Sequence, residues 1–154
     1  MEYFVLKWLH ILSSTFLFGT GIGSAFYMFF ASLTRDVRAI AVVVRYVVIA
    51  DTVFTATTVV IQPLTGWYLA RLLGFPLTAF WLKWSIGLFV LTGACWLPVV
   101  WMQIRMSRMA QAAVSGGTEL PLLYWRYFRY WTALGVPAFL ALVVVFYLMV
   151  AKPT

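Results

Sequence analysis

Residues 40–69 read IAVVVRYVVIADTVFTATTVVIQPLTGWYL, a long apolar run interrupted by only two charged side chains, Arg45 and Asp51. A helix needs about 20 mainly apolar residues to cross a hydrocarbon core about 30 Å thick. This run exceeds that length, and residues 3–30, 81–102 and 131–150 form three further runs of the same character. The sequence therefore predicts an integral membrane protein that spans the bilayer four times and forms a single membrane domain over residues 1–154.

The composition supports this interpretation. Hydrophobic residues make up 64% of the chain and charged residues 10%, with a mean hydropathy of +0.97, far from the averages of soluble domains. The first run has Glu2 in place of a basic segment and lacks a small-residue cleavage site, so we expect it to remain as a membrane helix. The predicted fold is all-α, a four-helix antiparallel bundle with no water-exposed catalytic domain.

The basic residues, which give the chain a net charge of +7, are distributed unequally between the connections. Seven lie in or beside the first and third connections: Arg35, Arg38, Arg45, Arg105, Arg108, Arg126 and Arg129. Four lie toward the other side: Lys7, Arg71, Lys83 and Lys152. Because short cytoplasmic loops carry the excess of Lys and Arg, we predict that both termini are external. The basic residues are then topology signals and lipid contacts, and no nucleic-acid partner is expected.

Small residues and prolines are expected to shape the helices. Gly19 and Gly23 form a small-xxx-small pattern in the first span, which predicts close packing against another helix. Each later span contains one proline, Pro63, Pro98 or Pro137, which frees a backbone carbonyl and bends the helix.

Polar residues recur along one face of the second span. Asp51, Thr55, Thr58 and Gln62 are spaced four, three and four residues apart, so they form one helical stripe. Polar and ionisable groups inside a bilayer are costly and are functional candidates by default. One interpretation of the stripe is a water-filled transport path, which would require a dimer because four helices are few for alternating access. Asp51 is expected near the cytoplasmic face, about 20 Å from the level of His10.

The candidate cofactor-binding residues lie in the outer half of the predicted bundle. His10, the only histidine, is expected about 10 Å below the outer boundary. An intramembrane histidine surrounded by cations is what a b-type haem requires, because imidazole ligates the iron and basic side chains meet the propionates. The predicted metal ligand is His10, and the other predicted cofactor-binding residues are Lys83, Arg71, Lys7, Gln62 and Met149.

Several alternatives to this site stay open at the level of sequence. The second axial position would be filled by Met149, by another weak ligand, by a histidine of a second protomer in a homodimer, or would be empty. His10 would otherwise hydrogen-bond Ser14 or Gln62 and only hold helices together, or the site would take a quinone or another small ligand. Copper and zinc are disfavoured, because one histidine, one cysteine and six scattered methionines do not supply their ligand sets.

Three stretches carry a resemblance to a known family. They are QPLTGW at residues 62–67, WLPVVWMQIRM at residues 96–106, and the opening LKWLHILSSTFLFGTGIGSAF at residues 6–26. Over essentially its whole length, the chain resembles a bacterial family of predicted integral membrane proteins of unknown function. This resemblance implies a multi-pass protein of the bacterial cytoplasmic (inner) membrane.

The first helix is also similar to those of HemJ-type protoporphyrinogen oxidases and CopD-type copper-resistance membrane proteins. The similarity to the HemJ group implies haem b bound through His10 and a role for Lys83, which follows Trp81 at the start of the third span. The chain departs from that group in two ways. The lysine of the HemJ group lies further from its tryptophan than Lys83 does from Trp81, and the later histidine of that group has no counterpart here. Porphyrinogen oxidation is therefore less well supported than haem binding.

These observations together predict an integral membrane haem-b protein that acts in electron transfer or a related redox step, with a quinone or a redox partner protein. Whether the chain is a membrane oxidoreductase or a subunit of one stays open. The rival prediction is a non-catalytic accessory or structural membrane subunit, or a small-molecule transporter, without haem.

Overall fold

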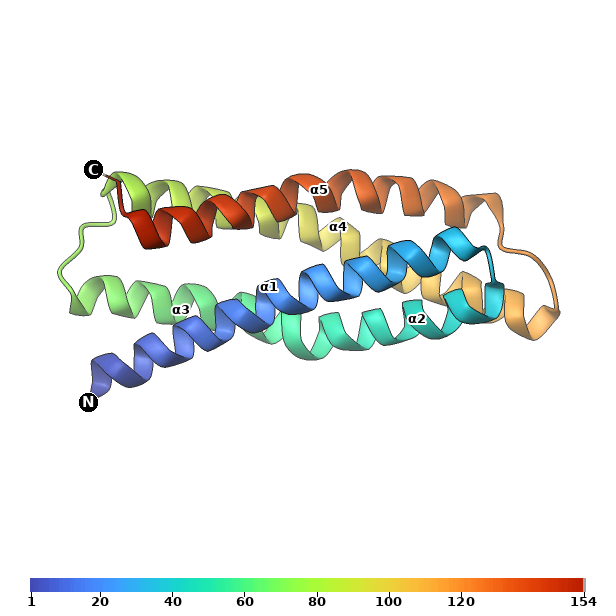
Figure 1. The fold of residues 1–154 in the computed structure, drawn as a ribbon, viewed down its shortest axis with the longest axis horizontal. Helices are drawn as coiled ribbons and strands as arrows, with labels where there is room; N and C mark the ends of the chain where they lie inside the picture. Colours follow the sequence, from blue (N-terminus) through green and yellow to red (C-terminus); the bar gives the residue numbers. More distant parts are fainter. Residues whose placement is uncertain (154) are drawn as a thin grey trace.

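The computed structural model describes residues 1–153, which form long antiparallel helices and no strand (Figure 1). The elements are α1 (Glu2–Thr34), α2 (Val37–Ala50), η1 (Asp51–Thr55), α3 (Ala56–Leu72), α4 (Phe80–Gly116) and α5 (Leu122–Ala151). The π-helical turn η1 joins α2 to α3 without a break, so the chain crosses the bundle four times and its termini lie at the same end. The predicted all-α four-helix architecture is confirmed.

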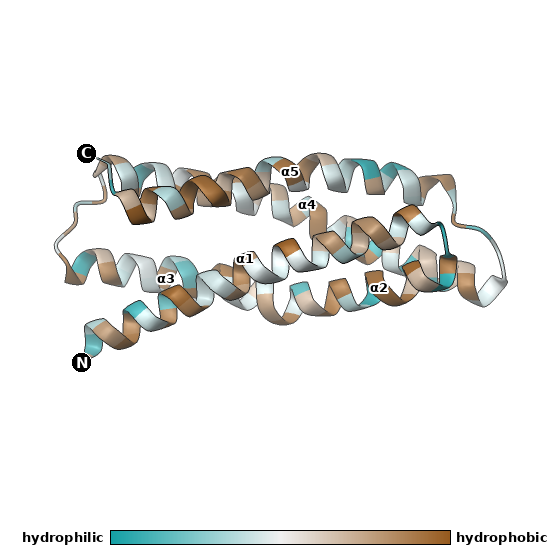
Figure 2. Ribbon diagram, in the orientation of Figure 1, coloured by the Kyte–Doolittle hydropathy of each residue, from teal (hydrophilic) through white to brown (hydrophobic). Residues whose placement is uncertain are grey.

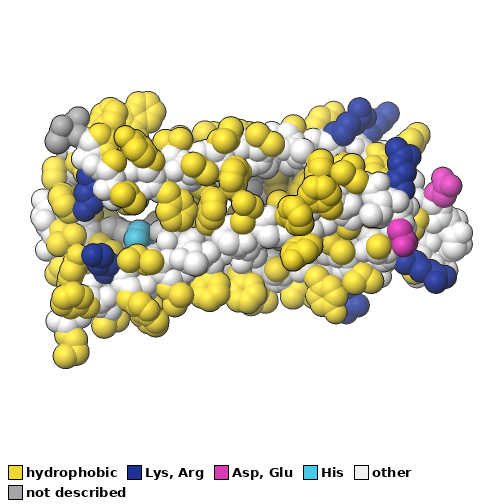
Figure 3. Space-filling model, in the orientation of Figure 1, with side chains coloured by type: hydrophobic (Ala, Val, Ile, Leu, Met, Phe, Trp, Pro, Cys, Tyr) yellow, Lys and Arg dark blue, Asp and Glu magenta, His cyan; other side chains and the backbone are white. Residues whose placement is uncertain are grey.

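All four long helices are apolar enough to span a bilayer. Hydrophobic residues run along their length, and charged side chains gather toward the two ends (Figures 2 and 3). Large apolar side chains such as Leu97 and Val90 are about two-thirds exposed, which a protein surrounded by water would not sustain. The chain is therefore an integral, multi-pass membrane protein whose exposed apolar surface faces lipid.

The helices are longer than the predicted spans because their ends continue beyond the apolar runs. The α2 helix begins at an Asp36 cap, whose Oδ1 accepts hydrogen bonds from the backbone N–H groups of Arg38 and Ala39. The α4 helix is capped by Gly117, whose left-handed conformation (φ 62°) favours glycine. The α5 helix starts at Leu122, so the aromatic and arginine-rich segment at residues 124–131 belongs to its first turns.

One half of the bundle is closed by large side chains. This closed half contains the connections at residues 35–36 and 117–121, and its core combines residues of α1, α2, α4 and α5. Ile40, Met106 and Tyr124 are fully buried there, and the Tyr124 hydroxyl is 3.0 Å from Ser32 Oγ. Met102 and Met106 are also buried in this core.

The other half of the bundle is open. In this open half α1 packs along α3 and α4 packs along α5, but the two pairs scarcely approach one another (Figure 1). Phe18 of α1 bridges them, with its ring centroid 5.4 Å from that of Phe139 and 5.2 Å from that of Phe146 on α5. Figure 3 shows a hollow in this half, with the chain's histidine exposed inside it and basic side chains nearby.

The expected packing of Gly19 and Gly23 against another helix of the chain is wrong. A Cβ atom built on either glycine would meet nothing within 4 Å. The reason is the orientation of α1, whose buried face carries Ser13, Leu17 and residues further along. Gly19 lies two residues after Leu17, about 200° around the helix from that face.

Candidate functional site

His10 of α1 lies directly against α3 in the open half. Its Nδ1 is 2.8 Å from Thr65 Oγ1, and its Nε2 is 3.2 Å from the side-chain nitrogen of Gln62. The ring passes over Gly66, where a Cβ would come within 3.1 Å of His10 Cε1, closer than most real contacts. Glycine at residue 66 therefore makes room for the imidazole, and the QPLTG segment supplies all three neighbours.

The hydrogen bonds of Thr65 indicate which imidazole nitrogen carries the proton. The Thr65 hydroxyl has one proton and donates it to the Ile61 carbonyl at 2.8 Å, so it accepts a hydrogen bond from His10 Nδ1–H. The lone pair of Nε2 is then the acceptor for the Gln62 amide N–H. The tautomer with its proton on Nδ1 leaves Nε2 as the nitrogen able to bind a ligand.

This arrangement fits a single metal-ligating histidine. Such histidines usually donate their second ring N–H to a protein acceptor, which fixes the orientation of the ring. Thr65 is that acceptor here. Gln62 covers Nε2, and its buried Oε1 has no hydrogen-bond partner among the described residues. A metal at Nε2 therefore requires the Gln62 amide to turn away, and the half-buried Gln62 side chain is already incompletely satisfied where it stands.

The remaining predicted cofactor residues lie toward the same end but do not converge on His10. Lys7 Nζ is 5.6 Å from the ring centroid of Tyr3, and the Arg71 guanidinium is 4.8 Å from that of Trp67. Lys83 is exposed near the start of α4, and Met149 is half-buried on α5. Over residues 1–153, no hydrogen bond, ion pair or metal-ligand cluster joins either of them to His10. The structure thus unites His10 with Gln62 and leaves the cations at the rim.

Sequence reasoning missed two residues of this site, Thr65 and Gly66. The predicted polar stripe stops at Gln62. A further step of three residues would have reached Thr65, which is buried on the same face. The alternative hydrogen bond to Ser14 is not formed, because that hydroxyl donates to the Ile11 carbonyl of its own helix.

The polar stripe itself lies on the buried face of the second span. Asp51, Thr55 and Thr58 are each at most 5% exposed. Thr55 Oγ1 donates to Asp51 Oδ1 at 3.0 Å, and Gln103 of α4 approaches the same carboxylate. Thr58 Oγ1 donates to the Phe54 carbonyl at 2.7 Å. These contacts make the stripe part of the packing between helices and do not describe an open water path.

Asp51 lies near the middle of its helix. It begins η1, near the middle of the continuous helix Val37–Leu72, about 20 Å from the start of that helix. Its place near the cytoplasmic face stays a prediction. π-Helical turns are rare and often mark functional positions, and this one coincides with the only acidic residue in the middle of a predicted span.

Two further hollows occur away from His10. One lies between α2 and α4 in the closed half, and the other is a surface depression lined by Glu2, Val5, Leu6 and Tyr68. Neither includes a predicted cofactor residue, so the candidate site rests on the His10 contacts and on the separation of the helix pairs.

Searches of curated proteins and of solved structures find no match to this sequence. Residues 4–153 match the family described as "Predicted integral membrane protein (DUF2269)", which covers nearly the whole chain. The chain therefore belongs to this family of integral membrane proteins.

Proposed function

We propose that this chain is a haem-b protein of the bacterial cytoplasmic membrane, with His10 as an axial ligand of the iron, acting in electron transfer or a related redox step. The observation that carries the proposal is the hydrogen-bonding of His10. Thr65 holds Nδ1–H, Gly66 leaves room for the ring, and Nε2 keeps its lone pair. The similarity of the first helix to HemJ-type proteins is consistent with the same ligand.

The separation of the helix pairs in the open half supports the proposal. The α1–α3 and α4–α5 pairs are apart there, and Phe18 separates the hollow from the closed half. The walls are mainly apolar, which suits a porphyrin face. Bound haem would supply a one-electron carrier, and its partner would be a membrane quinone or a redox protein.

Each residue of the candidate site has a defined role in this proposal. His10 would hold the iron through Nε2, Thr65 would orient the imidazole, and Gln62 would have to turn away from Nε2. Lys7, Arg71 and Lys83 lie close enough to the surface to meet propionates as exposed cations. Their contribution is small individually, because exposed charge pairs are screened by water.

Iron and haem stoichiometry distinguish the possibilities for the second axial position. Ligation by Met149, or an open position, gives one haem per chain. Ligation by His10 of two copies in a homodimer gives one haem per two chains. A haem assay on the purified protein, normalised to the protein concentration, separates the two.

The rival function is a non-catalytic membrane subunit in which His10 only joins α1 to α3. The Gln62 contact supports it, because both imidazole nitrogens are engaged by protein groups. In that case His10→Ala would cost about 1 kcal/mol of helix association, as interhelical polar contacts do, and would change no spectrum.

An absorbance spectrum of the protein purified in detergent after expression with haem supply tests the proposal. We expect a Soret band in the wild type and in Ser14→Ala, whose hydroxyl bonds only its own helix backbone, but not in His10→Ala. Circular dichroism confirms that the His10→Ala helices are intact. A wild-type protein without a Soret band contradicts haem binding, and a full Soret band in His10→Ala contradicts the ligand assignment.

A further inference from the structure

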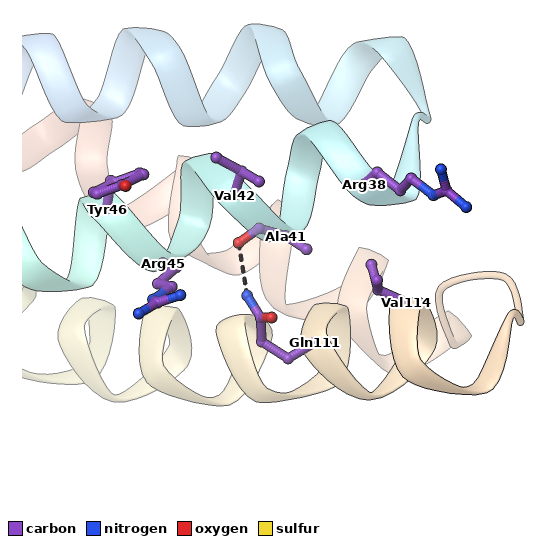
Figure 4. Close-up of a pocket in the computed structure, with 7 residues that line it drawn as sticks. All are labelled: Arg38, Ala41, Val42, Arg45, Tyr46, Gln111 and Val114. Atoms are coloured by element: carbon purple, nitrogen blue, oxygen red, sulfur yellow. Dashed lines mark hydrogen bonds between the residues drawn. The ribbon is translucent and has the colours of Figure 1, made fainter.

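A shallow cavity of about 290 Å³ lies between α2 and α4 in the closed half, far along the bundle from His10 (Figure 4). Its lining residues come from two helices: Arg38, Ala41, Val42, Arg45 and Tyr46 of α2, and Gln111 and Val114 of α4. The lining combines two guanidinium groups and a phenol with small apolar side chains. None of these residues takes part in the proposed haem site.

A hydrogen bond between the helices keeps the floor of this cavity in place. Gln111 Nε2 donates to the Ala41 carbonyl at 3.0 Å, and Ala41 is only 3% exposed. The bond joins the middle of the groove from side to side, as Figure 4 shows. The groove is therefore formed by the packing of α2 on α4 and does not need a ligand to open it.

Positive charge flanks the groove at both ends. Arg38 and Arg45 are seven residues apart on α2, which places them on one face with their Cα atoms about 10 Å apart along the helix axis. Both are exposed. The nearby Asp36 carboxylate accepts from the backbone amides of Arg38 and Ala39 as the cap of α2. Arg45 extends toward α4 beside the groove, whereas Arg38 extends past its end and away from Arg45 (Figure 4). The two cations make this surface positive and favour an anionic ligand.

An exposed apolar stripe leads from this groove toward the middle of the membrane. Val42, Tyr46, Ile49 and Val53 are spaced four, three and four residues apart on α2 and η1, so they share one helix face. All four are substantially exposed, from 46% at Ile49 to 65% at Tyr46. A ligand with a charged head at the arginines and a hydrocarbon tail along this stripe would satisfy both surfaces.

We propose that this groove binds an anionic phospholipid of the surrounding bilayer, with its phosphate held by Arg45 and by Arg38 once that side chain turns toward it, and with an acyl chain on the stripe from Val42 to Val53. Arginine donates bidentate hydrogen bonds to phosphate oxygens. The apolar stripe selects a membrane lipid over a free phosphate, since a soluble anion would leave that surface without a partner. Basic pockets between membrane helices bind anionic headgroups through the same combination of charge and apolar contact.

Lipid titration of the full-length protein, followed by native mass spectrometry, tests the proposal. Phosphatidylglycerol and phosphatidylcholine with identical acyl chains are the probes. We expect phosphatidylglycerol to bind at least tenfold more tightly, and the double variant Arg38→Gln/Arg45→Gln to lose that preference. The matched control, Arg126→Gln/Arg129→Gln, removes the same charge from the first turns of α5, outside the groove, and should keep it.

Three outcomes would overturn the proposal. Equal affinity for the two lipids, or equal losses in the groove and control variants, would show that the arginines act only as a diffuse charge. Competition with inorganic phosphate at matched concentration distinguishes a lipid ligand from free phosphate. If phosphate displaces phosphatidylglycerol completely, the groove is a phosphate site and the acyl stripe plays no part. Circular dichroism of each variant verifies that its helices are formed.

Discussion

The two halves of this bundle are built from the same four long helices, yet only one is closed. In the closed half Met28, Ile40 and Tyr124 are completely buried. In the open half the α1–α3 and α4–α5 pairs are joined mainly by the ring contacts of Phe18. Lipid is as apolar as these side chains, so helices associate in it through close packing and polar contacts. The closed half has both, whereas the open half has a histidine network within one helix pair.

This difference suggests that the closed half is the scaffold and that the open half contains the candidate site. Large side chains that interlock across four helices hold the closed half, and they leave no role for an additional ligand in its interior. The open half lacks such side chains between its pairs, although it contains the chain's only histidine and a glycine that accommodates the imidazole. A bound group between the helix pairs would replace the missing contacts.

The largest expected contrast between the halves is the side of the membrane that their connections face. The positive-inside bias predicts that the connections of the closed half face the cytoplasm and that both termini are outside. With Cys95 replaced by Ala, a membrane-impermeant maleimide should label Thr78→Cys, in the connection between α3 and α4, in intact cells. Thr118→Cys, in the connection before α5, should react only after lysis. Both threonines are exposed, so the reverse pattern would invert the orientation.

The next contrast concerns stability. Tyr124→Ala should destabilise the protein by about 3 kcal/mol, because it leaves a cavity in the closed core and removes the bond to Ser32. Tyr147→Ala, the same change at a side chain 65% exposed in the open half, should stay within about 0.5 kcal/mol. Unfolding in mixed micelles of increasing denaturing detergent measures both. Similar losses would mean that the halves do not differ in packing.

A smaller effect is expected from the residue that orients the imidazole. Thr65→Val removes the acceptor of His10 Nδ1–H and should weaken haem affinity about 10- to 100-fold without abolishing it. Thr57→Val is the matched control, since that exposed hydroxyl bonds only the backbone of its own helix. Haem titrations give both affinities. An unchanged affinity in Thr65→Val would show that Thr65 does not position the ligand.

The smallest effect should come from the rim of the open half. Lys83→Gln and Arg71→Gln should each weaken haem binding about fivefold or less, because exposed ion pairs contribute at most about 1 kcal/mol. Arg126→Gln at the opposite end should have no effect on haem affinity. Complete loss of haem in Lys83→Gln would instead mean that this lysine is as important as His10.

The fold followed from the sequence because apolar length and charge distribution determine membrane spans directly. Span boundaries were less accurate at residues 122–131, where aromatic and basic residues continue the helix through the headgroup region. The spacing of Gly19 and Gly23 predicted close packing against another helix, but neither glycine meets another helix of the described residues. Spacing within one helix does not reveal which face meets a neighbour.

For the candidate site, the sequence identified His10 and Gln62 as neighbours because antiparallel helices bring their ends to the same depth. It could not give the direction of each hydrogen bond, which depends on Thr65 donating to its own backbone. It also suggested that Met149, Lys83 and Arg71 would surround His10 closely. That expectation rested only on the similar depth of these residues along their helices. Depth does not show how far apart two helices lie, and here the helix pairs are separated.

The central claim is that the open half is a haem site centred on His10 Nε2, supported by a closed half that does not depend on the cofactor. Titration of cofactor-free protein in lipid nanodiscs with haemin, followed through the Soret band, tests it most directly. The account predicts a saturable, red-shifted band in the wild type, its absence in His10→Ala, and its retention in Tyr124→Phe, which alters only the closed half. A linear response without saturation, or equal saturation in His10→Ala, would contradict it.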